Sequence, residues 1–374
     1  MQTGRPKKET LITPQPSEHD YIKTQESKQE RARIEEAEKL VPGFIENMKK
    51  KEELQCALNT SMKKNLSLDT IKDDDVKCKK WTGFPTFSMF VAVFMFLEPK
   101  AATMTIWRGN VSTSESPGPV KRRRTLSLMD EFFLTMVRLK AGLHISDLAH
   151  RFSVSEGTVS ATFNTWLNLM YLEFKNLMEL PDPDVLWANK SEAFDKFSNT
   201  NLIVDCTEIF CESPSDLTEK KQLYSDYKHH QTFKFLVAIS AHPAVVYVSE
   251  MHGGRASDMF ITAHSQKFIE ASQLMGGKVM ADRGFTGTYK MTPVGIEFVT
   301  PVFKGIDRCQ LSSGEVEMSA ECSSARIHVE RIMQRIKIYR ILEGDLRLSM
   351  RYSAEQIFTV CAYLTNFQSP ILKK

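Results

Sequence analysis

The 374-residue sequence has few features of a secreted, disulfide-linked or membrane protein. Its seven cysteines are scattered and form no C-x-x-C pair, so neither a disulfide framework nor a zinc finger is indicated and a reducing compartment is expected. No apolar run opens the chain, as a signal peptide would require. The most apolar stretch, Phe84–Leu97, has 14 residues, fewer than the roughly 20 of a membrane helix. We predict a buried helix there and no membrane association.

Net charge is also scarce. Lysine and arginine number 49 against 46 acidic residues, which leaves a formal charge of +3. The whole molecule therefore has no electric field that would by itself indicate nucleic acid. Positive charge is instead local, as in the run Lys121, Arg122, Arg123 and Arg124. This run suits DNA phosphates or a nuclear localisation signal, and it can serve as both. We therefore expect the protein in the nucleus.

Composition along the chain predicts four parts. Residues 1–80 are rich in charge and poor in aromatics, which is typical of a partly disordered arm. Residues 81–120 combine a small apolar helical unit with a linker rich in Ser, Pro and Gly. Residues 121–181 are helical and end at a proline-rich stop. Residues 182–374 have a different texture and form the largest predicted domain.

This last part alternates short β-branched runs with helical segments. The predicted strands are Asn201–Asp205, Phe233–Ser240, Ala244–Ser249, Lys278–Asp282 and Glu297–Pro301. Helices are predicted at about Ala320–Leu342 and Ser353–Phe367. The pattern predicts an α/β fold, a mixed sheet flanked by helices, preceded by an all-α domain.

A helix-turn-helix is predicted at Ile145–Ser160, I-S-D-L-A-H-R-F-S-V-S-E-G-T-V-S. An apolar stripe at helical spacing marks its first helix: Ile145, Leu148, Ala149 and Phe152. Ser153-Val154 makes the turn, and Ser155 caps the second helix. That helix turns Val159 and Phe163 inward.

The outward side of the second helix carries short polar groups that can reach base edges in a major groove. These groups are Glu156, Thr158, Ser160 and Asn164, and Ser155 stands with them at the helix start. Arg151 and the Lys121–Arg124 run would hold phosphates, which give affinity and orientation rather than sequence preference. The alternative is a three-helix bundle that packs and binds nothing.

Three acidic residues are candidates for a metal site. Asp205 ends the apolar run L-I-V-D and Asp282 ends V-M-A-D. An unpaired carboxylate beside a core strand is costly, so a function is indicated. Glu330 lies mid-helix on the side that carries Arg326 and Lys337, where a solvated ion-pair stripe is the alternative. Phosphodiester cleavage without a covalent intermediate uses two metal ions about 3.5–4 Å apart, held by hard oxygen ligands of this kind.

Several phrases together resemble the PIF/Harbinger group of DDE transposases over roughly Thr125–Ile371. They are D-C-T-E-I (Asp205–Ile209), Y-S-D-Y-K-H-H (Tyr224–His230), G-G-R-A-S-D (Gly253–Asp258), M-A-D-R-G-F (Met280–Phe285), R-I-H-V-E-R (Arg326–Arg331) and L-T-N-F-Q (Leu364–Gln368). The phrase A-x-x-F-x-V-S-x-x-T-V-S resembles the helix-turn-helix of the same group.

The resemblance implies an RNase H-like catalytic fold that acts on double-stranded DNA. It implies that Asp205, Asp282 and Glu330 form the catalytic triad and hold two divalent ions, Mg²⁺ or Mn²⁺. The 47 residues between Asp282 and Glu330 agree with the spacing of the group. A Myb-like DNA-binding companion is implied, and a homo-oligomer is open. Many relatives carry a zinc-dependent THAP module, for which residues 1–110 have no matching pattern.

Two further acids are not expected to bind metal directly. Asp258 is predicted to be a helix N-cap, and Glu208 is predicted to support Asp205. The leading hypothesis is a metal-dependent DNA endonuclease and strand transferase. The second is a domesticated, non-catalytic DNA-binding protein of chromatin or transcription. A third is an interaction scaffold built on residues 81–109.

Overall fold

The computed structural model describes residues 30, 33, 36, 39–40, 42–53, 66–107, 124–177, 184, 192–194, 196–197, 200–274, 278–285, 296–302 and 310–371. The chain divides into two units, Met1–Asn65 and Leu66–Lys374. In the first, residues 42–53 are helical and exposed. The division falls earlier than the predicted end of the arm at residue 80, because Ile71 and Cys78 are fully buried in the core of the second unit.

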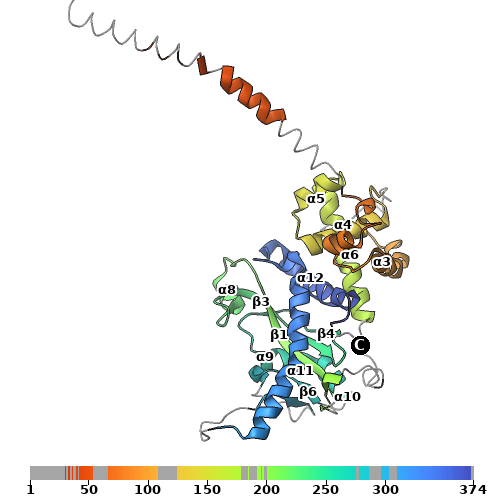
Figure 1. The fold of residues 1–374 in the computed structure, drawn as a ribbon, viewed down its shortest axis with the longest axis vertical. Helices are drawn as coiled ribbons and strands as arrows, with labels where there is room; N and C mark the ends of the chain where they lie inside the picture. The colour runs from red at the N-terminus through yellow and green to blue at the C-terminus, as the bar shows by residue number, and fades with distance from the viewer. Residues whose placement is uncertain are drawn as a thin grey trace, which may run out of the picture. The chain divides into compact units, whose positions relative to one another are not determined.

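The second unit begins with a helical region (Figure 1). Its elements are η1 (Leu68–Thr70), α2 (Asp75–Thr82), α3 (Phe87–Ala101), α4 (Leu128–Ala141), α5 (Ile145–Phe152) and α6 (Glu156–Leu177). The predicted buried helix is α3, which is capped by Thr86 and buries Phe90, Phe94 and Leu97. Within the described ranges no single helix is long and apolar enough to cross a membrane, although α2 and α3 together pass such a test as a bent pair.

Helices α5 and α6 form the predicted helix-turn-helix. Ser153 ends α5 in the left-handed conformation, with φ 53°, which turns the chain sharply. The Ser155 hydroxyl then accepts the Thr158 N–H at 3.1 Å and caps the start of α6. Val159 and Phe163 are buried as predicted. The inward pattern read from the sequence is confirmed.

The rest of the unit is a mixed sheet flanked by helices, as predicted. The strands are β1 (Thr200–Phe210), β2 (Tyr224–Ser225), β3 (His230–Ser240), β4 (Val245–Val248), β5 (His252–Gly253), β6 (Lys278–Met280) and β7 (Glu297–Val299). The helices are α8 (Leu217–Leu223), α9 (Asp258–His264), α10 (Gln266–Leu274), α11 (Ser313–Lys337) and α12 (Arg351–Leu364). Short 3-10 turns are η2 (Glu192–Phe194), η3 (Arg283–Phe285), η6 (Arg340–Leu342), η7 (Leu348–Met350) and η8 (Thr365–Phe367).

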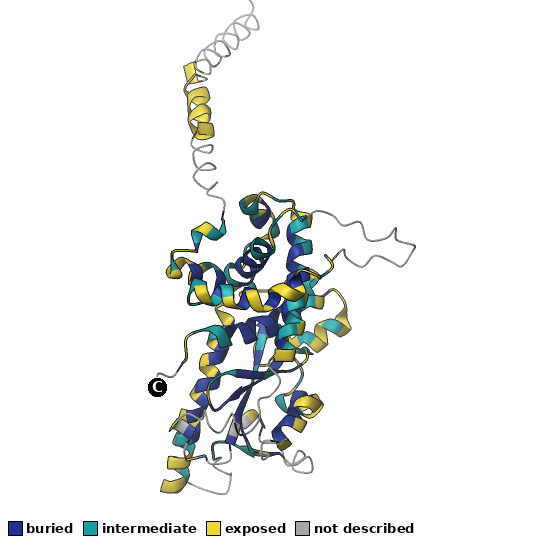
Figure 2. Ribbon diagram, turned by 90° about the vertical axis from the view of Figure 1, so that its right-hand side faces the viewer, coloured by how far each residue is buried: buried dark blue, intermediate teal, exposed yellow. Residues whose placement is uncertain are grey.

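The sheet order is β2-β3-β1-β6-β7, with β4 and β5 also paired to β3. Strand β3 runs antiparallel to β1, whereas β6 and β7 run parallel to it. Alternate residues of β1 point to different faces. Ile203 and Ile209 join the core beneath α11 and α12, and Val204 joins the core beneath α9 and α10. Figure 2 shows buried residues concentrated on the sheet and the inner sides of the helices.

The helical region and the sheet region share one continuous core. Phe367 of η8 lies 6.2 Å from Phe84 and 5.8 Å from Phe174 between ring centroids. A polar contact accompanies this packing: the Tyr171 hydroxyl of α6 donates a hydrogen bond to Glu355 of α12 at 2.5 Å. Helix α6 therefore begins at the turn of the helix-turn-helix and ends against the sheet region.

A buried acid fixes the start of α4. Glu131 is 5% exposed and accepts a bond from the Trp166 indole N–H at 2.9 Å. The Arg124 guanidinium pairs with the same carboxylate at 2.5 Å and also donates to two backbone carbonyls, those of Ala101 and Met104. Arg124 therefore ties three segments of the helical region together.

Replacing Arg124 with Ala should destabilise the protein by about 2–4 kcal/mol, because it leaves a buried carboxylate without its cation. Urea denaturation followed by circular dichroism measures this change. Lys77→Ala is the control: Lys77 pairs with Asp74 at 3.0 Å and both side chains are exposed, so its loss should change stability by no more than about 0.5 kcal/mol. Equal effects of the two substitutions would contradict the assigned role of Arg124.

Candidate active site

Two of the predicted acids lie side by side where the pairing between two neighbouring strands stops. Strands β1 and β6 are parallel neighbours, and Ile203 is paired with Met280. Asp205 and Asp282 each lie two residues beyond that pair. Because neighbouring strands are about 4.8 Å apart, the two backbones bring both carboxylates together just beyond the last pair of β1 and β6. The prediction that Asp205 ends its strand is wrong, because β1 continues to Phe210 through its pairing with β3. Asp205 has the parity of Ile203, so its side chain lies on the α11 side.

Arg326 of α11 serves as the cation for this pair of acids. Its Nη1 is 3.1 Å from Oδ1 of Asp282, and its charge also lowers the pKa of Asp205. The side chain of Arg326 is only 10% exposed. Its Nε is buried without a hydrogen-bond partner among the described residues. The sequence places Arg326 only on the helix face of Glu330, and its contact with Asp282 comes from the tertiary structure.

Asp205 is the most perturbed carboxylate of the site. Burial is the main cause, and it raises the pKa of Asp205 from 3.8 to about 6. The charge of Arg326 and a 2.8 Å bond from the Cys206 N–H oppose this rise, whereas the charges of Asp282 and Asp258 add to it. An acid that is desolvated and surrounded by like charges attracts any available cation.

Glu330 lies on α11 between Arg326 and Lys337, two cations whose charges interact with that of Asp205. Arg326 and Lys337 are 11 residues apart, about 16 Å along a helix, and both interact electrostatically with Asp205. Residues 326, 330 and 337 lie on one side of the helix at these spacings. Glu330 itself is exposed. It therefore lies on the same side of the sheet as the two aspartates.

The three predicted ligands are not gathered into one group. Among the residues that the structure describes, no set of three or more His, Cys, Asp and Glu side chains is close enough to hold a metal ion. Asp205 and Asp282 converge on Arg326, and the Glu330 side chain stays in solvent. The assignment of all three as ligands therefore stays a prediction.

The predicted DNA contacts are distributed unevenly. Ser155 is exposed, and the outward residues of α6 are half-buried, namely Thr158, Ser160 and Asn164. Arg151 forms an ion pair with Asp147 at 3.0 Å. Lys121, Arg122 and Arg123 lie outside the described residues. Arg124 has internal partners, and its phosphate contact stays a prediction.

Of the two lesser predictions, the helix cap at Asp258 is wrong and the support of Asp205 by Glu208 stays a prediction. Ser257, and not Asp258, caps α9, since its hydroxyl accepts the Phe260 N–H at 3.2 Å. Asp258 instead pairs with Lys234 at 2.7 Å. Glu208 lies 3.7 Å from Lys234 and accepts a bond from the Thr232 hydroxyl at 2.8 Å, on the face of β1 opposite to Asp205. The sequence carries no periodic pattern that would have paired Lys234 with either acid.

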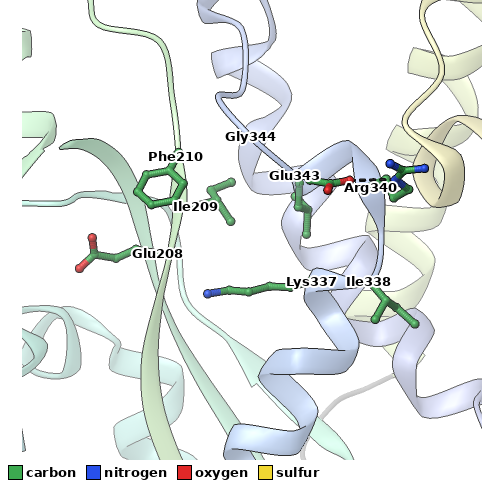
Figure 3. Close-up of a pocket in the computed structure, with 9 residues that line it drawn as sticks. Glu208, Ile209, Phe210, Lys337, Ile338, Arg340, Glu343 and Gly344 are labelled. Carbon is green, nitrogen blue, oxygen red and sulfur yellow. Dashed lines mark hydrogen bonds and ion pairs between the residues drawn. The ribbon is translucent and has the colours of Figure 1, made fainter. Parts of the chain in front are cut away.

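A cavity of about 440 Å³ lies beside the end of β1, lined by Glu208, Phe210, Lys337, Arg340 and Glu343 among others. Figure 3 shows the Lys337 ammonium extending toward β1, whereas the Glu208 carboxylate extends away from it on the far side of the strand. Arg340 pairs with Glu343 at 2.8 Å. Burial lowers the pKa of Lys337, Lys228 lowers it further, and Glu208 and Asp205 partly offset these effects.

Comparison with known families agrees with this arrangement. Residues 204–366 match the DDE superfamily endonuclease, and residues 124–176 match the helix-turn-helix of DDE superfamily endonuclease. The chain thus carries a DDE superfamily endonuclease domain preceded by its helix-turn-helix. The chain is 28% identical over 159 residues to the probable transposase for insertion sequence element IS702 of Microchaete diplosiphon. That alignment covers 42% of this chain and 54% of the relative, so the chain spans about half the length of that protein.

Replacing Asp205 with Asn should stabilise the protein at pH 8. The folded-state pKa of Asp205 is raised from 3.8 to about 6, so ionisation as pH rises through this window favours the unfolded state. Asn cannot ionise, and its advantage should vanish as pH falls toward 4. Thermal melts of both proteins between pH 4 and pH 8 test this. Asp226→Asn, which removes an exposed carboxylate, should show no such trend, and equal melting temperatures of wild type and Asp205→Asn at pH 8 would contradict the assignment.

Proposed function

We propose that this protein is a transposase-type DNA endonuclease and strand transferase that uses divalent metal ions. The observation that carries this proposal is the juxtaposition of Asp205 and Asp282 on neighbouring parallel strands within a matched DDE superfamily endonuclease domain. The similarity to the probable transposase for IS702 supports the substrate class, DNA. The same chemistry serves cleavage and joining, because both replace one oxygen at phosphorus with another.

The side chains present fit a divalent ion. The neighbouring carboxylates of Asp205 and Asp282 require a counter-charge, which Arg326 supplies in this structure. Their oxygens are hard ligands of the kind that Mg²⁺ and Mn²⁺ prefer. Asp205, Asp282 and Glu330 would hold two such ions after the Glu330 side chain turns toward the aspartates. When bound, divalent ions supply an activated water or 3′-hydroxyl and stabilise the leaving oxygen.

The residues around the acids have separate tasks in this proposal. The Cys206 N–H donates a hydrogen bond to one carboxylate oxygen of Asp205 and so fixes the orientation of that side chain. The apolar side of α11, including Val329 and Ile332, packs against the sheet and holds the Glu330 backbone at a fixed distance. Arg326 neutralises the acids before ions arrive. A rigid support of this kind keeps ligands close to their working geometry.

Reading of DNA belongs to the helix-turn-helix. The start of α6 enters a major groove in this proposal, with Thr158 and Asn164 at base edges. Lys121–Arg123 and Arg151 hold phosphates. The nucleus is the proposed location, and a Myb-like companion and a homo-oligomer are the proposed assemblies. These assignments follow from the PIF/Harbinger resemblance. The strand order β4-β3-β1-β6-β7, three antiparallel strands and then two parallel ones, supports an RNase H-like fold.

The second candidate is a non-catalytic DNA-binding protein that has kept the same fold. The exposed position of Glu330 and the absence of a three-residue ligand group in the described chain favour it. The two candidates differ in one measurable property, the metal dependence of DNA nicking.

Purified protein should nick DNA in Mg²⁺ or Mn²⁺, and Asp282→Asn should abolish nicking while DNA binding is retained, because the acids and the helix-turn-helix are separate. Glu330→Gln should also abolish nicking. The matched control is Glu321→Gln on the same helix, about 13 Å away along the axis, where Glu321 pairs with Lys196. Gel assays of supercoiled DNA measure both variants. Activity that survives Glu330→Gln but not Glu321→Gln would move the third ligand to another turn of α11.

Neutralising Lys121, Arg122 and Arg123 should weaken binding to all DNA sequences and reduce the salt slope by about 0.9 per lost phosphate contact. Arg124 is left unchanged because it supports the fold. Thr158→Ala or Asn164→Ala should instead change preference at particular base pairs by about 1–3 kcal/mol. Fluorescence anisotropy across a salt series measures both effects. An unchanged slope in the triple variant would remove the run from the DNA interface.

A further inference from the structure

A buried charge cluster lies on the face of the sheet beneath α9. Lys234 of β3 stands opposite Glu208 of β1 in the strand register. Its Nζ is 2.7 Å from Oδ1 of Asp258 and 3.7 Å from Oε1 of Glu208, and it donates to the Ala256 carbonyl at 3.1 Å. Only 13% of the Lys234 side chain is exposed. Burial lowers the pKa of Lys234, but the bond and charge of Asp258 outweigh this effect and raise it.

Asp258 contacts both segments that carry the proposed ligands. Its carboxylate is close enough to the thiol of Cys206, the residue after Asp205, to raise the pKa of that thiol, together with burial, which is the main cause. Its Oδ2 also lies against Gly284, two residues after Asp282, where an added Cβ would be 2.8 Å from that oxygen. One carboxylate therefore lies near Cys206 in the middle of β1 and against the turn that follows β6.

The turn after β6 needs such a contact. Strand β6 has only three residues, and the Ala281 N–H makes the last bond to β7, at 3.0 Å from the Val299 carbonyl. Asp282 lies beyond that bond. Its backbone carbonyl accepts only the local bond from the Phe285 N–H at 3.1 Å among the backbone bonds described. The sheet ladder alone therefore does not fix the distance between Asp282 and Asp205.

We propose that Asp258, held by Lys234, is a positioning residue that sets the spacing between Asp205 and Asp282. The inference rests on the proposed function of these two aspartates as metal ligands. Asp258 is not itself a ligand in this proposal, because Lys234 neutralises it and it lies on the α9 side of the sheet. Its carboxylate cannot move away freely, since Lys234 is bound in turn to the Ala256 carbonyl and Glu208.

The test is calorimetric titration of the full chain with Mn²⁺, together with urea denaturation of each variant. Asp258→Asn and Gly284→Ala should each weaken Mn²⁺ binding about tenfold, as loss of a group that orients a ligand does. The added methyl group of Gly284→Ala pushes against a fixed carboxylate. Combining Gly284→Ala with Asp258→Ala makes room for it, so the two effects should not add.

A charge-free version separates positioning from stability. The triple substitution Glu208→Gln, Lys234→Met and Asp258→Asn removes all three charges of the cluster at similar volume, so the protein should unfold at nearly the wild-type urea concentration while binding Mn²⁺ about tenfold more weakly. Lys278→Met is the control, because it breaks an ion pair with Glu297 on the same sheet at a more exposed position. It should leave Mn²⁺ affinity unchanged.

The outcomes distinguish two failures. If wild-type protein binds no Mn²⁺, the proposed metal site is wrong and the positioning role falls with it. If wild type binds Mn²⁺ and the Asp258 and Gly284 variants are folded but bind it equally well, only the positioning role is overturned. Additive effects in the Gly284→Ala and Asp258→Ala combination would also count against it.

Discussion

Two carboxylates just beyond the paired part of two parallel strands impose the main electrostatic demand on this protein. Asp205 and Asp282 occupy equivalent places on β1 and β6, and burial and mutual repulsion make the ionised form of Asp205 costly. A cation must therefore be close, and Arg326 supplies it from α11. The position of α11 across the sheet follows from its apolar side, which belongs to the same core as Ile203 and Ile209.

The opposite face of the sheet also carries buried acids, and there a lysine supplies the counter-charge. There Lys234 lies between two acids, Glu208 and Asp258, and the group is closed off by α9. A buried ion pair contributes little net stability, because desolvation offsets most of the attraction. Its geometric effect is larger, since each partner fixes the orientation of the other. In the proposals made above, the two faces hold charge for different purposes, metal binding on one and alignment of the ligands on the other.

The link between DNA reading and chemistry is a single helix. Helix α6 begins at the cap of Ser155 and ends against α12, so the base-reading end and the sheet region belong to one packed unit. Tyr171 and Glu355 add a polar contact to this packing. Helices that share a core over this length move together. The distance from the start of α6 to the acids is therefore a property of the fold rather than of a linker.

The sequence alone determined the classes of element and the candidate acids. Apolar periodicity predicted α3, the helix-turn-helix and the two closing helices, and β-branched runs predicted the main strands, since these patterns reflect which side of an element is buried. The apolar runs before Asp205 and Asp282 singled out these two acids for a physical reason, the cost of an unpaired carboxylate near a core. The predicted end of the strand at Asp205 was wrong, because β1 continues to Phe210. Glu330 depended on family resemblance, because an exposed acid among cations looks the same whether or not it binds metal.

Only the tertiary structure decided which charges meet. Arg124 was predicted at phosphates, yet it pairs with Glu131, seven residues away across the entry to α4. Arg326 reaches Asp282 across 43 intervening residues, and Lys234 reaches Asp258 across 23. Periodic patterns report burial, which is a property of one element at a time. Ion pairs depend on strand order, register and helix position together, and these are set when the chain packs.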